Sequence, residues 1–170
     1  MKTKFFLTLS FVFLLIGCQF KSKEEQCQKN KKVTLSQDTL NKVTYVNPKS
    51  LTASSNYSYA TIAPENARMV YVSGINAGSG NGIPKDLGEQ MRITFERLET
   101  ILKEVGSKPE CITMIKQYTT RYDREFFDIF LKERSKFMKG AKPSSALIPM
   151  AKLPNVNLDI EIELVCFVCD

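Results

Sequence analysis

The chain has 170 residues, with 24 Lys plus Arg against 18 Asp plus Glu, five Cys, no Trp and no His. This length fits one ordinary domain with a targeting segment and is too short for a multidomain enzyme. Because no imidazole is present, Ser-His-Asp and Cys-His hydrolases, His metal sites and His acid-base pairs are all excluded. Any catalysis has to use carboxylates, Tyr, Lys, Cys or water.

The N-terminus has the pattern of a secretory signal. Two lysines, Lys2 and Lys4, precede a largely apolar run over residues 5–17. A bilayer span needs roughly 20 apolar residues, so we expect a signal peptide rather than a permanent transmembrane helix. The run ends in Leu15-Ile16-Gly17-Cys18, which resembles the lipobox of bacterial lipoproteins, where the Cys receives the lipid. The alternative is a plain signal peptide, for which an Ala-x-Ala cleavage site is expected and none is present.

We therefore predict a signal peptide over residues 1–17, lipidation at Cys18 and a flexible polar tether up to residue 56. The expected location is the bacterial cell envelope, as a periplasmic or outer-membrane lipoprotein. Residues 19–56 carry a net charge of +4, whereas residues 57–170 carry 15 basic and 15 acidic residues and are neutral. A nucleic-acid-binding domain normally has a basic face, so we expect no nucleic acid partner.

The folded domain is predicted to begin at residue 57 with two short β-prone runs, residues 57–62 and 69–73. Turn-forming residues, Pro64-Glu65-Asn66-Ala67, separate them, so the two runs are predicted to pair as a hairpin. A Gly-rich loop follows over residues 78–82. It lies between a predicted strand and a helix but lacks the spacing of a phosphate-binding motif, so we interpret it as a surface loop.

Apolar residues recur at helical spacing from Leu87 to Val105 and predict an amphipathic helix that ends at Gly106. Residues 111–120 are typical of a strand. Asp123 is suited to cap a second helix that runs to about Phe137, and residues 145–151 are predicted to form a further strand.

The last segment has the strongest period-2 pattern of the chain. From Leu158 onward every second residue is apolar, while the intervening residues are acidic in the first half and apolar in the second. Both faces of the later half therefore need cover, in a core or in a partner subunit. The order β-β-α-β-α-β-β predicts an α+β fold with two helices on one face of the sheet.

Several of these residues together resemble the reactive intermediate deaminase family, Rid, also called YjgF and formerly L-PSP endoribonuclease. The resemblance covers nearly all of residues 57–170. It depends on Tyr57-Ser58, Val70-Tyr71-Val72-Ser73-Gly74, Gln90, and Leu153-Pro154 followed by Ile160-Glu161-Ile162-Glu163. It implies a chorismate-mutase-like α+β fold, assembled as a homotrimer with ligand sites between subunits.

The same resemblance indicates site residues. In deaminating members, a Glu at the end of the final motif places the attacking water, and Glu163 matches it, although its spacing from Leu153-Pro154 is one residue longer. An Arg two residues after a Pro binds the substrate carboxylate. Here Pro143-Ser144-Ser145 places Ser145 at that position, and Leu147 stands where many members carry a Cys. A hydroxyl cannot supply the bidentate grip of a guanidinium, so poor binding of amino-acid imines is expected.

Each candidate also has a structural interpretation. Glu163 is the candidate for acid-base work or water positioning, but Asp159, Glu161 and Glu163 also fit a solvated strand face. Tyr57 either contacts a ligand or is an ordinary strand aromatic. Ser73-Gly74 either lets a ligand approach the backbone or ends a strand. Ser144, Ser145 and Leu147 are the remaining substrate-site candidates. Two lysines near Ser145 either replace part of the missing charge or are solvated on the surface: Lys142 and Lys152.

Cys166 and Cys169 form a C-x-x-C pattern, but residues i and i+3 of a strand point to opposite faces, which disfavours a redox pair or shared metal ligands. No second pair completes a zinc site, and we expect neither metal nor cofactor. Buried free thiols are the simpler interpretation. Export also permits a disulfide among Cys27, Cys111, Cys166 and Cys169, whose pairing the sequence does not reveal.

Two functions remain open. One is hydrolysis of an enamine or imine with a non-standard substrate grip, in which Glu163 orients water. The other is a non-catalytic small-molecule-binding module, favoured by Ser145 in place of Arg. Ribonuclease activity is disfavoured because the domain is neutral and has no His.

Overall fold

The computed structural model describes residues 42–169, all of which fall in one compact unit. The predicted signal peptide, Cys18 and most of the predicted tether lie outside the described residues. The elements are β1 (Thr44–Val46), β2 (Ala60–Ile62), β3 (Met69–Ile75), α2 (Leu87–Glu104), a 3-10 helix (Pro109–Cys111), β4 (Ile112–Thr119), α3 (Arg124–Met138), β5 (Ser144–Pro149) and β6 (Ile160–Phe167). Within this part of the chain, neither helix has the length and apolar character needed to cross a bilayer.

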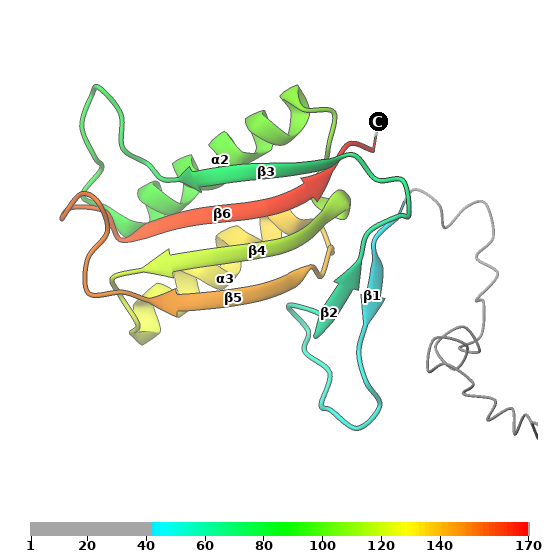
Figure 1. Cartoon of the computed structure of the whole chain (residues 1–170). Helices are drawn as coiled ribbons and strands as arrows, with labels where there is room; N and C mark the ends of the chain where they lie inside the picture. Colours follow the sequence, from blue (N-terminus) through cyan, green and yellow to red (C-terminus); the bar gives the residue numbers. More distant parts are fainter. Residues whose placement is uncertain (1–41, 170) are drawn as a thin grey trace, which may run out of the picture. The chain divides into compact units, whose positions relative to one another are not determined.

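Four strands form the main sheet in the order β3-β6-β4-β5. β6 pairs antiparallel with both β3 and β4, whereas β4 and β5 are parallel and α3 connects them. A parallel pair needs such a crossover because a tight turn can only reverse the chain. Both helices lie on the same face of this sheet (Figure 1). The α+β fold with two helices on one face, predicted from the sequence, is therefore confirmed.

The helices are amphipathic and bury their apolar stripes against the sheet. Asp86 caps α2, its side chain accepting a hydrogen bond from the Glu89 N–H at 2.7 Å, and the helix is followed by Gly106 with φ +66°. Asp123 caps α3, as predicted, and its carboxylate accepts a bond from the Phe126 N–H at 2.8 Å. The core includes fully buried side chains from both helices and the sheet: Met91, Leu98, Phe126, Ile115, Ile160, Ile162 and Cys166.

The predicted hairpin between residues 57–62 and 69–73 is wrong. β2 pairs instead with β1, with Thr44 opposite Ile62, and β3 pairs with β6. The period of a strand indicates which face is buried but carries no information about its partner. β1 lies inside the segment predicted as tether, so the folded domain begins before residue 57. The two-stranded sheet is joined to the main sheet by the Thr61 hydroxyl, which donates to the Thr113 carbonyl at 2.7 Å.

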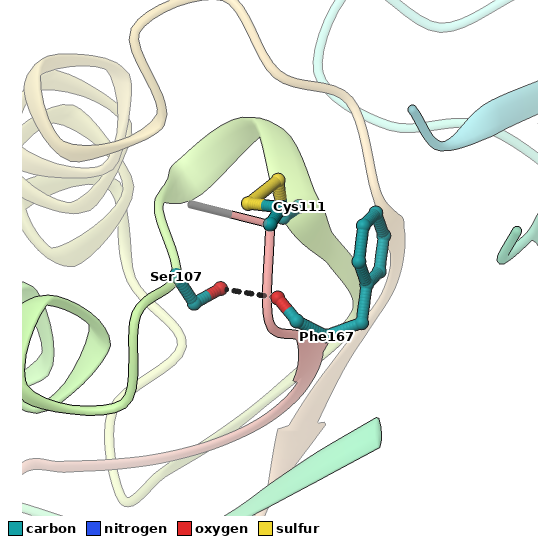
Figure 2. Close-up of a disulfide and its surroundings, with 4 residues drawn as sticks. Ser107, Cys111 and Phe167 are labelled. Carbon is teal, nitrogen blue, oxygen red and sulfur yellow. Dashed lines mark hydrogen bonds between the residues drawn. A yellow bond between two sulfur atoms is a disulfide. The ribbon is translucent and has the colours of Figure 1, made fainter. Parts of the chain in front are cut away.

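A disulfide between Cys111 and Cys169 ties the 3-10 helix to the chain after β6. Figure 2 shows it beside the Ser107 hydroxyl, which donates to the Phe167 carbonyl at 2.8 Å. Cys166 is buried and free, so the two thiols of the C-x-x-C pattern do not pair with each other, as the strand geometry predicts. The interpretation as buried free thiols holds for Cys166 but is wrong for Cys169, which lies beyond the end of β6 and bonds to Cys111.

Candidate functional site

The face of the main sheet that points away from the helices carries the polar side chains of β6. Residues opposite each other in paired strands project from the same face. Glu163 is opposite Lys116, and Val165 is opposite both Met114 and Tyr71. We call this surface, made by Tyr71, Met114, Lys116, Tyr118, Glu161, Glu163 and Val165, the open face.

Glu163 lies near the middle of the open face in contact with two side chains of β4. The Tyr118 hydroxyl donates to its carboxylate at 3.1 Å, and the Lys116 ammonium is 3.5 Å from the same oxygen. The side chains of Lys116 and Glu163 are each 40% exposed, so this ion pair is reachable by a solute. Partial burial, followed by the hydrogen bond to Glu163 and its charge, raises the pKa of Tyr118. Tyr118 therefore stays protonated and available as a donor over the neutral pH range.

A pocket of about 130 Å³ lies over these residues and is lined partly by Tyr71, Met114, Glu163 and Val165. Its walls are mainly apolar, with Lys116 and Glu163 as the charged groups. Ligand pockets commonly combine apolar walls with a few polar groups that orient the ligand. Tyr71, on the edge strand β3, is 78% exposed at the margin of this pocket.

Ser73 and Gly74 lie near the end of β3, at a bulge across from position 163, and Gly74 approaches the side chain of Glu161. A Cβ at position 74 would be 2.6 Å from Glu161 Oε1, so a larger residue there would require the Glu161 side chain to move. Asn76 Nδ2 donates to the other oxygen of Glu161 at 2.8 Å, while Ser73 is exposed. Asn76 has no signal in the sequence, whereas Glu161 belongs to the final motif and to the predicted solvated strand face. The two-residue spacing of Glu161 and Glu163 was the available signal, because it places both carboxylates on one face of a strand.

A larger pocket, of about 380 Å³, lies at the outer edge of β3, and Gly74 and Arg97 are among its lining residues. Arg97 Nη1 donates to the carbonyls of Asn76 and Gly78, which holds the guanidinium at this edge. The pocket therefore combines a cation with apolar walls from α2 and β3. The sequence does not single out Arg97, because it is one more polar residue on an amphipathic helix.

Ser145 and Leu147 lie on the other side of the sheet from Glu163. Ser145 is opposite Ile115, which is buried under the helices, and Leu147 packs against the same core. The Ser145 hydroxyl accepts a bond from Gln117 Nε2 at 3.3 Å. Within one chain the structure therefore does not bring these two candidates together with Glu163.

The other predicted residues are also separated from Glu163. The Ser144 hydroxyl donates to the Thr113 carbonyl at 2.9 Å, next to β2. Tyr57 lies before β2, with its ring 6.0 Å from that of Tyr59 in an edge-on contact. Lys142 and Lys152 are exposed in the segments on either side of β5. Within residues 42–169, no three His, Cys, Asp or Glu side chains are grouped so that they could hold a metal ion.

The 78–82 segment is an exposed turn, as predicted. Ser79 and Gly82 exchange two backbone hydrogen bonds, of 3.1 and 2.9 Å. Gly82 has φ +97°, in the left-handed region that favours Gly.

Comparison with known proteins agrees with this architecture. The sequence model of the family described as Endoribonuclease L-PSP matches residues 47–168. No curated protein matches the chain. Among solved structures, YyfB of Yersinia pestis, described as a Rid family protein of unknown function, is 22% identical with a TM-score of 0.67, and the match covers 74% of this chain and 98% of YyfB.

Two further structures are similar over most of their length. A putative endoribonuclease L-PSP from Entamoeba histolytica is 26% identical with a TM-score of 0.53, covering 74% of this chain and 99% of that protein. E. coli TdcF, solved with bound serine, is 22% identical with a TM-score of 0.52, covering 68% of this chain and 90% of TdcF. The family match spans well over half of the chain, and the fold agrees with it. The chain therefore belongs to the endoribonuclease L-PSP family, which includes the proteins named Rid and YjgF.

Proposed function

We propose that this protein binds a small enamine or imine on the open face and hydrolyses it to a carbonyl compound and ammonia. The observation that supports this best is the environment of the Glu163 carboxylate. Its carboxylate is half exposed, borders a pocket and is held by Tyr118 and Lys116. A carboxylate positioned in this way can accept a proton from water at the moment of attack.

In the proposed reaction, water adds to the imine carbon while Glu163 takes its proton. The carbon–oxygen bond forms and the electron pair of the carbon–nitrogen double bond moves to nitrogen. Tyr118 or Lys116 protonates that nitrogen, which gives a carbinolamine, and Glu163 returns its proton to the donor. The hydroxyl proton of the carbinolamine then passes through Glu163 to the nitrogen, the carbon–nitrogen bond breaks, and ammonia leaves as the carbonyl forms. An enamine first becomes the imine by moving one N–H proton to its β-carbon. Tyr118 and Lys116 are the donors in contact with Glu163, so each proton is returned within one cluster.

We also propose that the protein assembles as a homotrimer, because it belongs to this family. The exposed Tyr71 and its apolar neighbours on the open face support it, since such a surface is normally covered. Assembly would bring residues from a second copy to the edge of the Glu163 pocket.

A second function, ligand binding without catalysis, is favoured by Ser145. Its side chain lies on the helix-facing side of β5 and is bonded to Gln117, so it offers no cation to a substrate carboxylate. Loss of one partner of a buried charge pair typically costs about 2–5 kcal/mol in binding.

The test is release of keto acid from 2-aminoacrylate and from bulkier imines by the purified full-length protein. Wild type is expected to be active, and Glu163→Gln is expected to lower kcat/KM by about 100-fold or more, because acid-base groups contribute that much. Glu65→Gln, an exposed loop residue, is the control and should leave activity unchanged.

Turnover separates the two proposed functions. Ser145 faces the helices, so Ser145→Arg would not bring a cation to the Glu163 pocket within one chain and is not a useful test. If wild type releases no keto acid and Glu163→Gln behaves identically, the hydrolase is contradicted and the binding module is favoured.

We also propose that Cys18 anchors the protein to a membrane through a lipid, based on the lipobox-like Leu15-Ile16-Gly17-Cys18. Cys18→Ala is expected to release the protein into the soluble fraction. Unchanged partitioning between membrane and soluble fractions would contradict lipidation.

A further inference from the structure

Arg134 on α3 is a buried cation without a counter-ion. Its side chain is 5% exposed, Nη1 donates to the Asn56 carbonyl at 2.9 Å, and Nη2 is buried without a hydrogen-bond partner. Burial lowers the pKa of Arg134, and no acidic side chain among residues 42–169 pairs with it. A buried guanidinium without a counter-charge is unfavourable, because it has lost water and gained no anion in return.

Arg134 is one of the residues that line a pocket of about 70 Å³. The pocket lies between the segment at Ser55 and Asn56, the C-terminal half of α3, and the loop that leads to β5. Ser135 and Lys142 are among the other lining residues, so a hydroxyl-bearing residue and a second cationic residue lie at the boundary of this pocket. A volume of this size admits a carboxylate or phosphate group, since one water occupies about 30 Å³ in the liquid.

The charge of the pocket favours an anion over a neutral solute. The C-terminus of α3 supplies only about half a negative charge. The two full positive charges of Arg134 and Lys142 therefore exceed this partial negative charge, and the net charge around the pocket is positive. The planar guanidinium, with several N–H donors, is suited to the paired oxygens of a carboxylate or phosphate.

We propose that the pocket bounded by Arg134, Ser135 and Lys142 is a binding site for a small oxyanion, either a carboxylate or a phosphate group. α3 covers the face of the sheet opposite the open face, so this site is separate from the Glu163 pocket. It does not depend on the hydrolytic function proposed above.

The experiment is calorimetric titration of the purified full-length protein with inorganic phosphate and, in parallel, with acetate at equal ionic strength. Saturable binding is expected for at least one of them, and the tighter anion identifies phosphate or carboxylate as the preferred group. Arg134→Met is expected to weaken binding at least tenfold. Arg124→Met is the matched control, because Arg124 is on the same helix with its side chain 95% exposed, and binding should stay within twofold of wild type.

Lys142→Met provides a second variant, since an exposed loop residue can be replaced without disturbing the core. It should weaken binding severalfold, and a circular dichroism spectrum confirms that each variant is folded. The proposal is overturned if neither anion binds saturably to wild type, or if folded Arg134→Met and Lys142→Met both bind as tightly as wild type.

Discussion

At the scale of single residues, the positions that carry the most specific geometry are buried polar side chains. Gln90 is 1% exposed and connects three backbone groups: Nε2 donates to the carbonyls of Pro84 and Asn157, and Oε1 accepts from the Asp159 N–H. It thus joins the segment before α2 to the segment before β6. The sequence marked Gln90 only through the family resemblance, because a Gln on the apolar face of a helix looks like an interruption of the pattern.

Replacing Gln90 with Ala leaves these three backbone groups without their partner. Buried unpaired groups typically cost 1–3 kcal/mol each, and part of this is recovered by water, so we expect the free energy of unfolding to fall by about 3 kcal/mol. Urea denaturation measures the change. Lys103→Ala, at an exposed position of α2, should change it by less than about 0.5 kcal/mol. Equal effects of the two variants would contradict this account of Gln90.

At the scale of elements, each helix begins where a side chain satisfies its free N–H groups. At α3 the Asp123 carboxylate accepts from the Phe126 N–H and also contacts Arg121, whose Nε is 2.9 Å from Oδ2. The bond to Arg121 and then the backbone bond from Phe126 lower the pKa of Asp123. A lowered pKa in the folded state means that the charged form stabilises the fold above the ordinary pKa, and that this stabilisation is lost as the pH falls.

Asp123→Ala is therefore expected to lower the urea midpoint at about pH 7. The difference from wild type should shrink as the pH falls through about 4, the ordinary pKa of Asp, and below it. Asp123→Asn keeps a side-chain acceptor without the charge, so it should recover part of the loss at neutral pH and show less dependence on pH. A difference between Asp123→Ala and wild type that is the same at about pH 7 and pH 2.5 would be inconsistent with this mechanism.

At the scale of the whole molecule, a disulfide stabilises the domain, and one uncovered surface is available for assembly. The link between Cys111 and Cys169 spans 58 residues of the chain, and the Cys169 N–H also donates to the Gly106 carbonyl at 2.9 Å. The end of the chain is thereby tied to the segment before β4. Cys166, three residues earlier, is buried in the core and is not part of this link.

Loss of the disulfide should destabilise the domain by about 4 kcal/mol, the loop-closure entropy for a loop of this length. Guanidinium denaturation with and without a reductant measures the difference. The double variant Cys111→Ser with Cys169→Ser is expected to lack any dependence on the reductant. If the double variant responds to the reductant as wild type does, the stabilising link lies elsewhere.

The uncovered surface is the open face around Tyr71. Tyr71→Glu places a charge on the surface that we propose is covered in a homotrimer, so we expect the mass in solution to fall from that of three chains to that of one. Native mass spectrometry of the full-length protein gives the result. Tyr122→Glu, an exposed aromatic before α3, is the control and should leave the mass unchanged. A wild type that is strictly monomeric would remove the trimer from the proposal.

The sequence by itself determined the elements whose signals are local. The spacing of apolar residues from Leu87 and the cap at Asp123 predicted both helices close to their observed ends, and alternation predicted β6. Period-2 alternation also identified which side chains of β6 are buried, because Ile160 and Ile162 enter the core while Glu161 and Glu163 do not. Such signals suffice because the buried face of an element depends on its own residues.

Only the tertiary structure decided which elements meet. β2 pairs with β1 instead of β3, β4 and β5 run parallel, and Cys111 bonds to Cys169. The same is true of the sites, since Ser145 faces away from Glu163 and Arg134 is buried beside Lys142. These contacts join residues far apart in the chain. Their choice depends on the packing of the whole domain, which a local periodicity does not encode.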